Sequence, residues 1–144
     1  MSQYYELGEV TLWNPSNGAS RLFLHQAALF EEEVGLPSGI GPVRNDEVQI
    51  SPEAFKVFVH ALLGWRGRTR HVVISALSDG FLATVLVLAD RAGIVVEWPD
   101  RSSGDAPDRR DVQVGSGAVP VIDPDGWEAR MRDQARELAG FMPR

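Results

Sequence analysis

The chain has 144 residues, and its hydrophobic fraction of 44% and charged fraction of 24% are typical of a globular protein with one buried core. It contains no cysteine, which excludes disulfides and thiolate chemistry, and its formal net charge of −6 argues against a general nucleic-acid-binding role. The N-terminal residues show neither a basic region nor an apolar signal segment. We therefore expect a cytoplasmic protein that forms a single domain over residues 1–144.

The N-terminal part of the chain contains a strand signal followed by a helix signal. Residues 4–13 are rich in strand formers, and a glycine near their middle predicts a bend, a bulge or a tight hairpin. Asn14 is a good N-cap and Pro15 suits the first helical position, although an Asn-Gly pair just after them favours a later start. The first helix is therefore predicted from Pro15 or Ala19 to Val34.

A second strand and a second helix follow a glycine-rich loop. Residues 47–50 alternate as a short strand does, and residues 51–53, Ser-Pro-Glu, form a strong helix start. The helix is expected to end at Gly64 or Gly67. Because the linker to the next helix is short, the two helices should pack as antiparallel neighbours.

The central helix, predicted over residues 71–92, organises the rest of the chain. It is apolar on nearly all sides, and Asp79 is the one charged residue in its long apolar run. Polar residues interrupt that run at its middle, which favours a buried core helix over a membrane span. We expect Leu77 and Leu88 to be buried, and Gly93 to end the helix in a Schellman motif.

The C-terminal third is predicted from composition and from one more apolar stripe. Residues 94–98 have the composition of a strand, and residues 100–118 are expected to form a mobile loop because they are polar and lack periodicity. A last helix is predicted over residues 123–140. Taken together, these elements predict an α+β fold in which a small, mainly antiparallel sheet packs against about four helices.

Three histidines are the first candidates for acid–base chemistry. His60 lies away from the apolar stripe of its helix and is interpreted as a solvated surface residue. His71 lies at the start of the central helix, where positive charge opposes the helix dipole. His25 lies at the edge of an apolar stripe, so it is either a helix-packing residue or an acid–base group in a cleft. No histidine pair has metal-ligand spacing, and we expect neither a metal ion nor a cofactor.

Two charged clusters lie where the helix dipole is unfavourable to them. The carboxylates of residues 31–33 crowd the end of the first helix, and the start of the central helix is crowded by Arg66, Arg68, Arg70 and His71. Three interpretations stay open. The clusters are two solvated runs, or they approach each other, or the arginines bind an anionic ligand or partner.

Asp79 is the polar residue of greatest interest, because no fully polar helix face is available to it. We expect it to be at least partly buried. Its carboxylate then either bonds to an arginine, a tryptophan indole or a loop backbone, or binds a ligand, or acts as an acid–base group.

The stretches LWNPSNGASRLF, EVGLPSGIGP and SDGFLATVLVLADRAG resemble a family of small uncharacterised actinobacterial proteins, described as a domain of unknown function. The resemblance covers roughly the first 95 residues. It implies no activity, cofactor or partner, so no functional residue is carried over from it.

Two functional hypotheses follow. The first is a small cytoplasmic binding or accessory protein, which contacts a protein partner or a second copy and neither nucleic acid nor membrane. The second is a small enzyme or ligand carrier, in specialised metabolism, with an apolar pocket between helices and His25 and Asp79 as acid–base groups. The candidates for ligand or partner contact are Trp13, Asn14, Arg66, Arg68, Arg70 and His71. Convergence of Asp79, His25 and Trp13 on a closed pocket would favour the second hypothesis, and a wide apolar surface patch the first.

Overall fold

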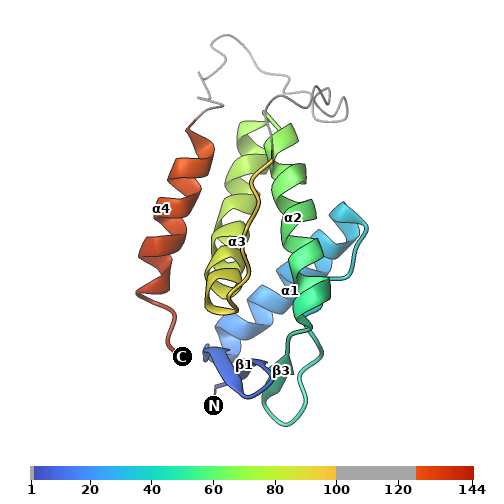
Figure 1. Ribbon diagram of the computed structural model, residues 1–144, viewed down its shortest axis with the longest axis vertical. Coiled ribbons are helices and arrows are strands. Elements are labelled where there is room, and N and C mark those ends of the chain that lie inside the picture. Colours follow the sequence, from blue (N-terminus) through green and yellow to red (C-terminus); the bar gives the residue numbers. More distant parts are fainter. Residues whose placement is uncertain (1, 100–125) are drawn as a thin grey trace.

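The computed structural model describes residues 2–99 and 126–144, and within these ranges it contains three strands and four helices (Figure 1). Helices α2 and α4 flank the central helix α3, and the small sheet lies at one end of the helices. The predicted α+β class, with a buried central helix, is confirmed. In chain order the elements are β1 (Tyr4–Leu7), β2 (Val10–Trp13), α1 (Asn17–Val34), β3 (Glu47–Gln49), α2 (Pro52–Arg68), α3 (Val72–Arg91) and α4 (Trp127–Ala139).

The sheet is mixed, with the strand order β2-β1-β3. Strands β1 and β2 form the antiparallel hairpin that the sequence suggested, and Gly8 turns it with a φ of 61°. Strand β3 pairs with β1 in parallel, placing Val48 beside Tyr5. The sequence predicted a mainly antiparallel sheet, and the parallel pairing of β3 with β1 was not predicted. Helix α1 carries the chain back across the molecule, so that β3 enters the sheet in the same direction as β1.

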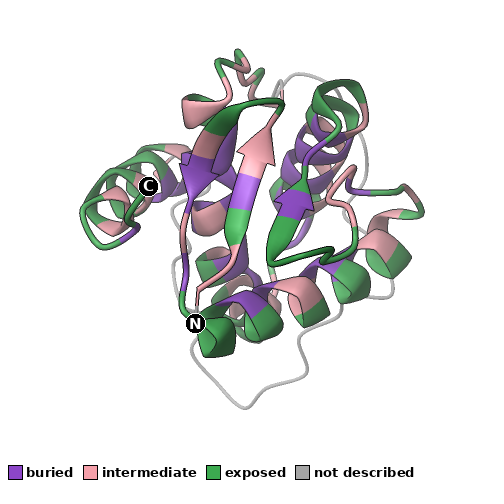
Figure 2. Cartoon of the chain, turned by 90° about the horizontal axis from the view of Figure 1, so that it is seen from below, coloured by how far each residue is buried: buried purple, intermediate pink, exposed green. Residues whose placement is uncertain are grey.

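Helix α1 begins later than the proposed cap at Asn14. The N-cap is Ser16, whose hydroxyl accepts a hydrogen bond of 3.3 Å from the backbone N–H of Ala19. The helix ends at Gly35, which adopts a left-handed conformation with a φ of 71°. Seen from the sheet end, α1 has buried positions facing the body and exposed positions along its outer side (Figure 2).

Helix α2 runs to Arg68, one residue past the later of the two predicted ends. The end of α3 agrees with the prediction, because Gly93 has a φ of 71° and its N–H donates to Asp90 O at 3.0 Å. The N–H of Ile94 donates to Ala89 O at 2.9 Å. These two bonds complete the predicted Schellman motif.

The C-terminal half of α3 forms the centre of the core. Leu88 is fully buried, and the ring of Phe81 stacks on the ring of Phe30 with centroids 4.7 Å apart. By length and composition alone, α3 could cross a membrane, but 56% of its most apolar window is buried against the rest of the chain. Its contacts with α1, α2, α4 and β2 are those of a core helix.

Among the described residues, the N-terminal half of α3 is covered on one side only. Leu77 is 73% exposed and Val73 is 56% exposed, so the prediction that Leu77 is buried is wrong. The error came from assuming that every side of an apolar helix is covered by the same chain.

Residues 94–98 do not form the predicted strand. They run back along α2 and α3 without joining the sheet (Figure 1). Ile94, Val96 and Trp98 pack against the core, while the residues between them are exposed. This alternation resembles that of a strand, although the apolar side contacts helices and no neighbouring strand.

The last helix is shorter than predicted, spanning Trp127–Ala139, and it buries Trp127 and Met131 against α3. Gly126 is its N-cap position. Residues 123–125, as well as the loop predicted over residues 100–118, lie outside the described residues.

Candidate functional site

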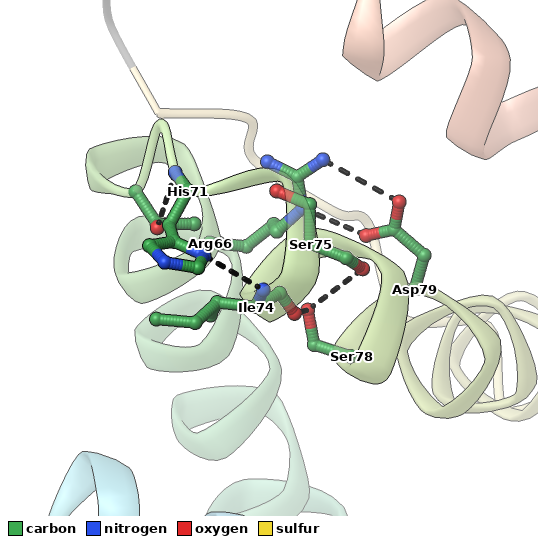
Figure 3. A network of polar contacts seen from close by, with 7 residues as sticks. Arg66, His71, Ile74, Ser75, Ser78 and Asp79 are labelled. Carbon is green, nitrogen blue, oxygen red and sulfur yellow. Dashed lines mark hydrogen bonds and ion pairs between the residues drawn. The ribbon is translucent and has the colours of Figure 1, made fainter. Parts of the chain in front are cut away.

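Asp79 and Arg66 connect α3 to α2 through an ion pair (Figure 3). Arg66 Nε donates to Asp79 Oδ1 at 2.7 Å, and Nη2 donates to Oδ2 at 3.4 Å. The Arg66 side chain is 6% exposed and that of Asp79 is 29% exposed. Asp79 is therefore partly buried, as expected, and its partner is one of the arginines that the sequence had singled out.

Aromatic rings of α4 and of the segment after α3 complete the surroundings of this ion pair. The guanidinium carbon of Arg66 lies 4.9 Å from the ring centroid of Trp127. Trp127 in turn contacts Trp98 edge-on, with ring centroids 5.6 Å apart. The guanidinium carbon of Arg132 lies 4.7 Å from the ring centroid of Trp98. The arrangement joins α2, α3 and α4 by charge and cation–π contacts.

His71 lies beside the ion pair and serves as the N-cap of α3. Its Nδ1 accepts a hydrogen bond of 3.4 Å from the N–H of Ile74, so the ring satisfies a backbone donor at this helix end (Figure 3). Ser78 Oγ donates to Ile74 O at 2.8 Å, whereas Ser75 Oγ is buried without a partner. The polar network around His71 thus contains one buried hydroxyl without a hydrogen-bond partner, that of Ser75.

The remaining members of the two charged clusters do not meet. Arg68 and Arg70 are exposed, as are Glu32 and Glu33. In the part of the chain that the structure describes, the ion pairs are Arg66–Asp79 and a surface pair within α4, so none joins one cluster to the other. The interpretation in which these clusters approach each other within one chain is not supported.

A surface pocket of about 440 Å³ lies beside the N-terminal half of α1. Arg21 and His25 stand one turn apart on its wall, and neither forms a hydrogen bond or an ion pair with another described residue. Asp79 and Trp13 are not part of the pocket. Its lining comprises Gln3, Asn17, Arg21, Leu24, His25 and Val43.

Trp13 and Asn14 belong to the core and to the C-terminal contact. The ring of Trp13 is buried, 5.2 Å from the Tyr5 ring and 5.4 Å from the Phe23 ring. The N–H of Asn14 donates to Pro143 O at 2.8 Å, while its buried Oδ1 has no partner. The structure therefore does not bring Asp79, His25 and Trp13 together around one pocket.

Exposed apolar side chains lie on the N-terminal half of α3. Leu77 is 73% exposed and lies one turn before Phe81, whose ring stacks on that of Phe30. Val73 lies one further turn toward the start of α3. We refer to Val73 and Leu77, which lie one turn apart on α3, as the apolar face.

Comparison with known proteins identifies the family. A family model matches residues 1–144. The chain belongs to DUF6086, a family of unknown function. The family match extends through the C-terminal region, beyond the first 95 residues that carried the resemblance. No curated protein and no solved structure matches the chain significantly.

Two features of the site were missed from the sequence. His60, interpreted as a solvated residue, accepts a hydrogen bond of 3.0 Å at Nε2 from the backbone N–H of Glu97, 37 residues away. The apolar face was missed because a helical stripe does not indicate which helix covers it.

Among the described residues, no three His, Asp or Glu side chains are grouped so that they could hold a metal ion.

Proposed function

We propose that this chain is a small binding protein that docks a protein partner on its apolar face. The observation that carries the proposal is the 73% exposure of Leu77 on the most apolar helix of the fold. Burying a leucine side chain stabilises a complex by about 1.5–3 kcal/mol. Grouped apolar side chains on a protein surface are typical of interaction sites.

The state of the ionisable side chains supports binding over catalysis. Asp79 is held by Arg66, His71 caps α3, and His60 accepts a bond from the backbone of Glu97. Each group already has a structural partner, whereas a catalytic acid or base must be free to reach a substrate proton. This leaves His25 as the histidine that faces a pocket.

A second candidate function is that of a carrier for a small anionic ligand, and the pocket of α1 favours it. Its volume of about 440 Å³ lies within the range of small-molecule sites. Arg21 is a fixed cation on its wall, and no carboxylate lines it. An NMR titration with benzoate tests this function, because specific shifts at Arg21 and His25 should disappear in Arg21→Gln.

Other parts of the proposal rest on sequence alone. A cytoplasmic location is proposed from the composition of the chain, which contains no cysteine, and an actinobacterial origin is proposed from the resemblance of the three motifs. A place in specialised metabolism belongs to the carrier alternative.

Site-specific photocrosslinking tests the docking proposal. A benzophenone side chain at Leu77 should capture a defined partner in living cells. The same group at Val57, which is 55% exposed on α2, is the control. An adduct specific to position 77 supports the proposal, and identical adducts at both positions, or none at position 77, would overturn it.

A further inference from the structure

The pocket beside α1 has cationic and amide side chains in its lining and no carboxylate. Arg21 is a permanent cation that only donates hydrogen bonds, and His25, one turn further along α1, becomes a second cation when it is protonated. Both side chains are exposed, and neither forms an ion pair or a hydrogen bond with another described residue. The two groups are therefore available to an anion from solvent.

A chain of hydrogen bonds from the core fixes the orientation of the Gln3 amide, which also lines the pocket. Ser20 is fully buried, and its hydroxyl donates to Gln3 Oε1. Because the Ser20 hydroxyl has a single hydrogen, the buried Tyr5 hydroxyl, 2.8 Å away, donates to Ser20 Oγ. Gln3 Oε1 is thus occupied, while Gln3 Nε2 forms no hydrogen bond with another described residue. The Nε2 donors of Gln3 are left for the pocket.

Hydrocarbon forms most of the surface of this pocket. Leu24 contributes to it from α1, and Val43, which is 38% exposed, contributes from the loop before β3. A bare inorganic anion would leave these side chains in contact with water, whereas a ligand with an apolar group would cover them. An apolar wall with a few convergent polar groups is typical of small-molecule sites.

We infer that the pocket binds a carboxylate that carries an apolar group, such as a branched or an aromatic acid. Arg21, protonated His25 and Gln3 Nε2 donate to the carboxylate oxygens. Leu24 and Val43 contact the hydrocarbon part of the ligand. The inference rests on the second candidate function, since it names the ligand class of the same pocket.

Four probes separate the two parts of this recognition. In NMR titrations at fixed ionic strength, benzoate should give saturable shifts at Arg21 and Val43. Benzamide has the ring without the charge, and acetate and inorganic phosphate have charge without the ring, so each should bind at least about tenfold more weakly than benzoate. Benzamide that binds as tightly as benzoate would overturn recognition of the negative charge. Acetate or phosphate that binds as tightly would overturn the apolar contact.

A pair of matched variants tests the Gln3 donor. Gln3→Glu keeps an oxygen for the Ser20 hydroxyl but replaces Nε2 by a carboxylate oxygen, so benzoate should bind at least about tenfold more weakly. The control Gln26→Glu makes the same charge change on α1 outside the pocket lining, and it should change the affinity by less than about twofold because salt screens the added charge. Both variants should keep the wild-type circular dichroism spectrum. Equal losses of affinity in the two variants would overturn donation by Gln3.

The same titrations separate failure of the inference from failure of the second candidate function. Benzoate and phosphate that bind equally well, and lose binding in Arg21→Gln, would support an anion site in the pocket while overturning the ligand class. Absence of saturable shifts with every anionic probe would overturn both. Docking at the apolar face is tested independently by the crosslinking experiment.

Discussion

Asp79 and Arg66 form the ion pair that fixes how α3 meets α2, and the arginine is the more deeply buried member, at 6% exposure of its side chain. A buried guanidinium needs a charged acceptor, because removing one partner leaves the other uncompensated. The cation–π contact with Trp127 extends the same constraint to α4.

The first prediction concerns the loss of this pair. Asp79→Asn should lower the free energy of unfolding by about 1–3 kcal/mol, because Arg66 keeps its burial and loses its charged acceptor. Urea unfolding of the variant measures the change. Capture of a partner by a benzophenone side chain at position 77 should stay at the wild-type level, since Asp79 lies on another side of α3 from Leu77.

The surface pair Arg136–Asp133 provides the control for Asp79. It has a similar N···O distance of 3.0 Å, but its side chains are 77% and 72% exposed. Asp133→Asn should leave the urea midpoint almost unchanged, because exposed ion pairs contribute little. Equal effects of the two Asn variants would contradict a structural role for Asp79.

The second prediction contrasts two leucines of α3. Leu88→Ala should lower the free energy of unfolding by about 2–5 kcal/mol, because Leu88 is fully buried and leaves a cavity. Leu77→Ala should have little effect on unfolding, because Leu77 is 73% exposed and its truncation leaves no buried cavity. A large loss of single-chain stability in Leu77→Ala would show that the face is covered within the chain.

These two leucines show how much of the fold can be predicted from the sequence. Periodicity and end signals predicted the helices well, because caps and glycine stops are local. Periodicity predicted that Leu77 and Leu88 are both buried, although only Leu88 is. Residues 94–98 were misassigned for a related reason, since alternating burial against helices resembles a strand in the sequence.

The sequence predicted that Asp79 is partly buried and has a partner, but it did not predict which residues pair with each other. The absence of a polar helix face correctly indicated that Asp79 is partly buried and needs a partner. Its choice of Arg66 depends on how α2 and α3 cross, and the bond of His60 to Glu97 depends on the path of the chain after α3. Such contacts between distant residues leave no spacing in the sequence.

The third prediction concerns Arg91, which connects the end of α3 to two other parts of the chain. Its guanidinium donates to Leu12 O at 2.8 Å, to Ala139 O at 3.1 Å and to Met142 O at 2.8 Å. Burial, with a further contribution from Arg144, lowers the pKa of Arg91. An arginine nevertheless stays charged at neutral pH, so all three bonds are charge-assisted.

Arg91→Met should therefore loosen the C-terminal segment while the aliphatic packing is kept. The N–H of Asn14 donates to Pro143 O, and its amide hydrogen exchange should become faster in the variant. Exchange of core amides such as that of Leu88 should change less. Unaltered exchange at Asn14 would show that the segment is held by other contacts, such as the buried Met142.

The fourth prediction concerns Tyr5, a fully buried residue whose hydroxyl lies 2.8 Å from Ser20 Oγ. Burial raises the pKa of Tyr5 above its ordinary value of 10.0, and the hydrogen bond with Ser20 only partly opposes this effect. The folded state therefore binds the phenolic proton more tightly than the unfolded state does. This contribution to stability is fully present below the unfolded pKa and is lost as the pH rises toward and through the folded pKa.

The wild-type chain should accordingly lose stability above a pH of about 10. Tyr5→Phe should show a smaller alkaline loss, because the titrating group is absent, although the variant starts from a lower stability at pH 8 through the lost bond to Ser20. Tyr4→Phe is the matched control, because Tyr4 is exposed, and it should lose stability as the wild type does. Urea unfolding at pH 8, 10 and 11 measures all three slopes. Parallel slopes for Tyr5→Phe and the wild type would show that the alkaline loss arises from other groups.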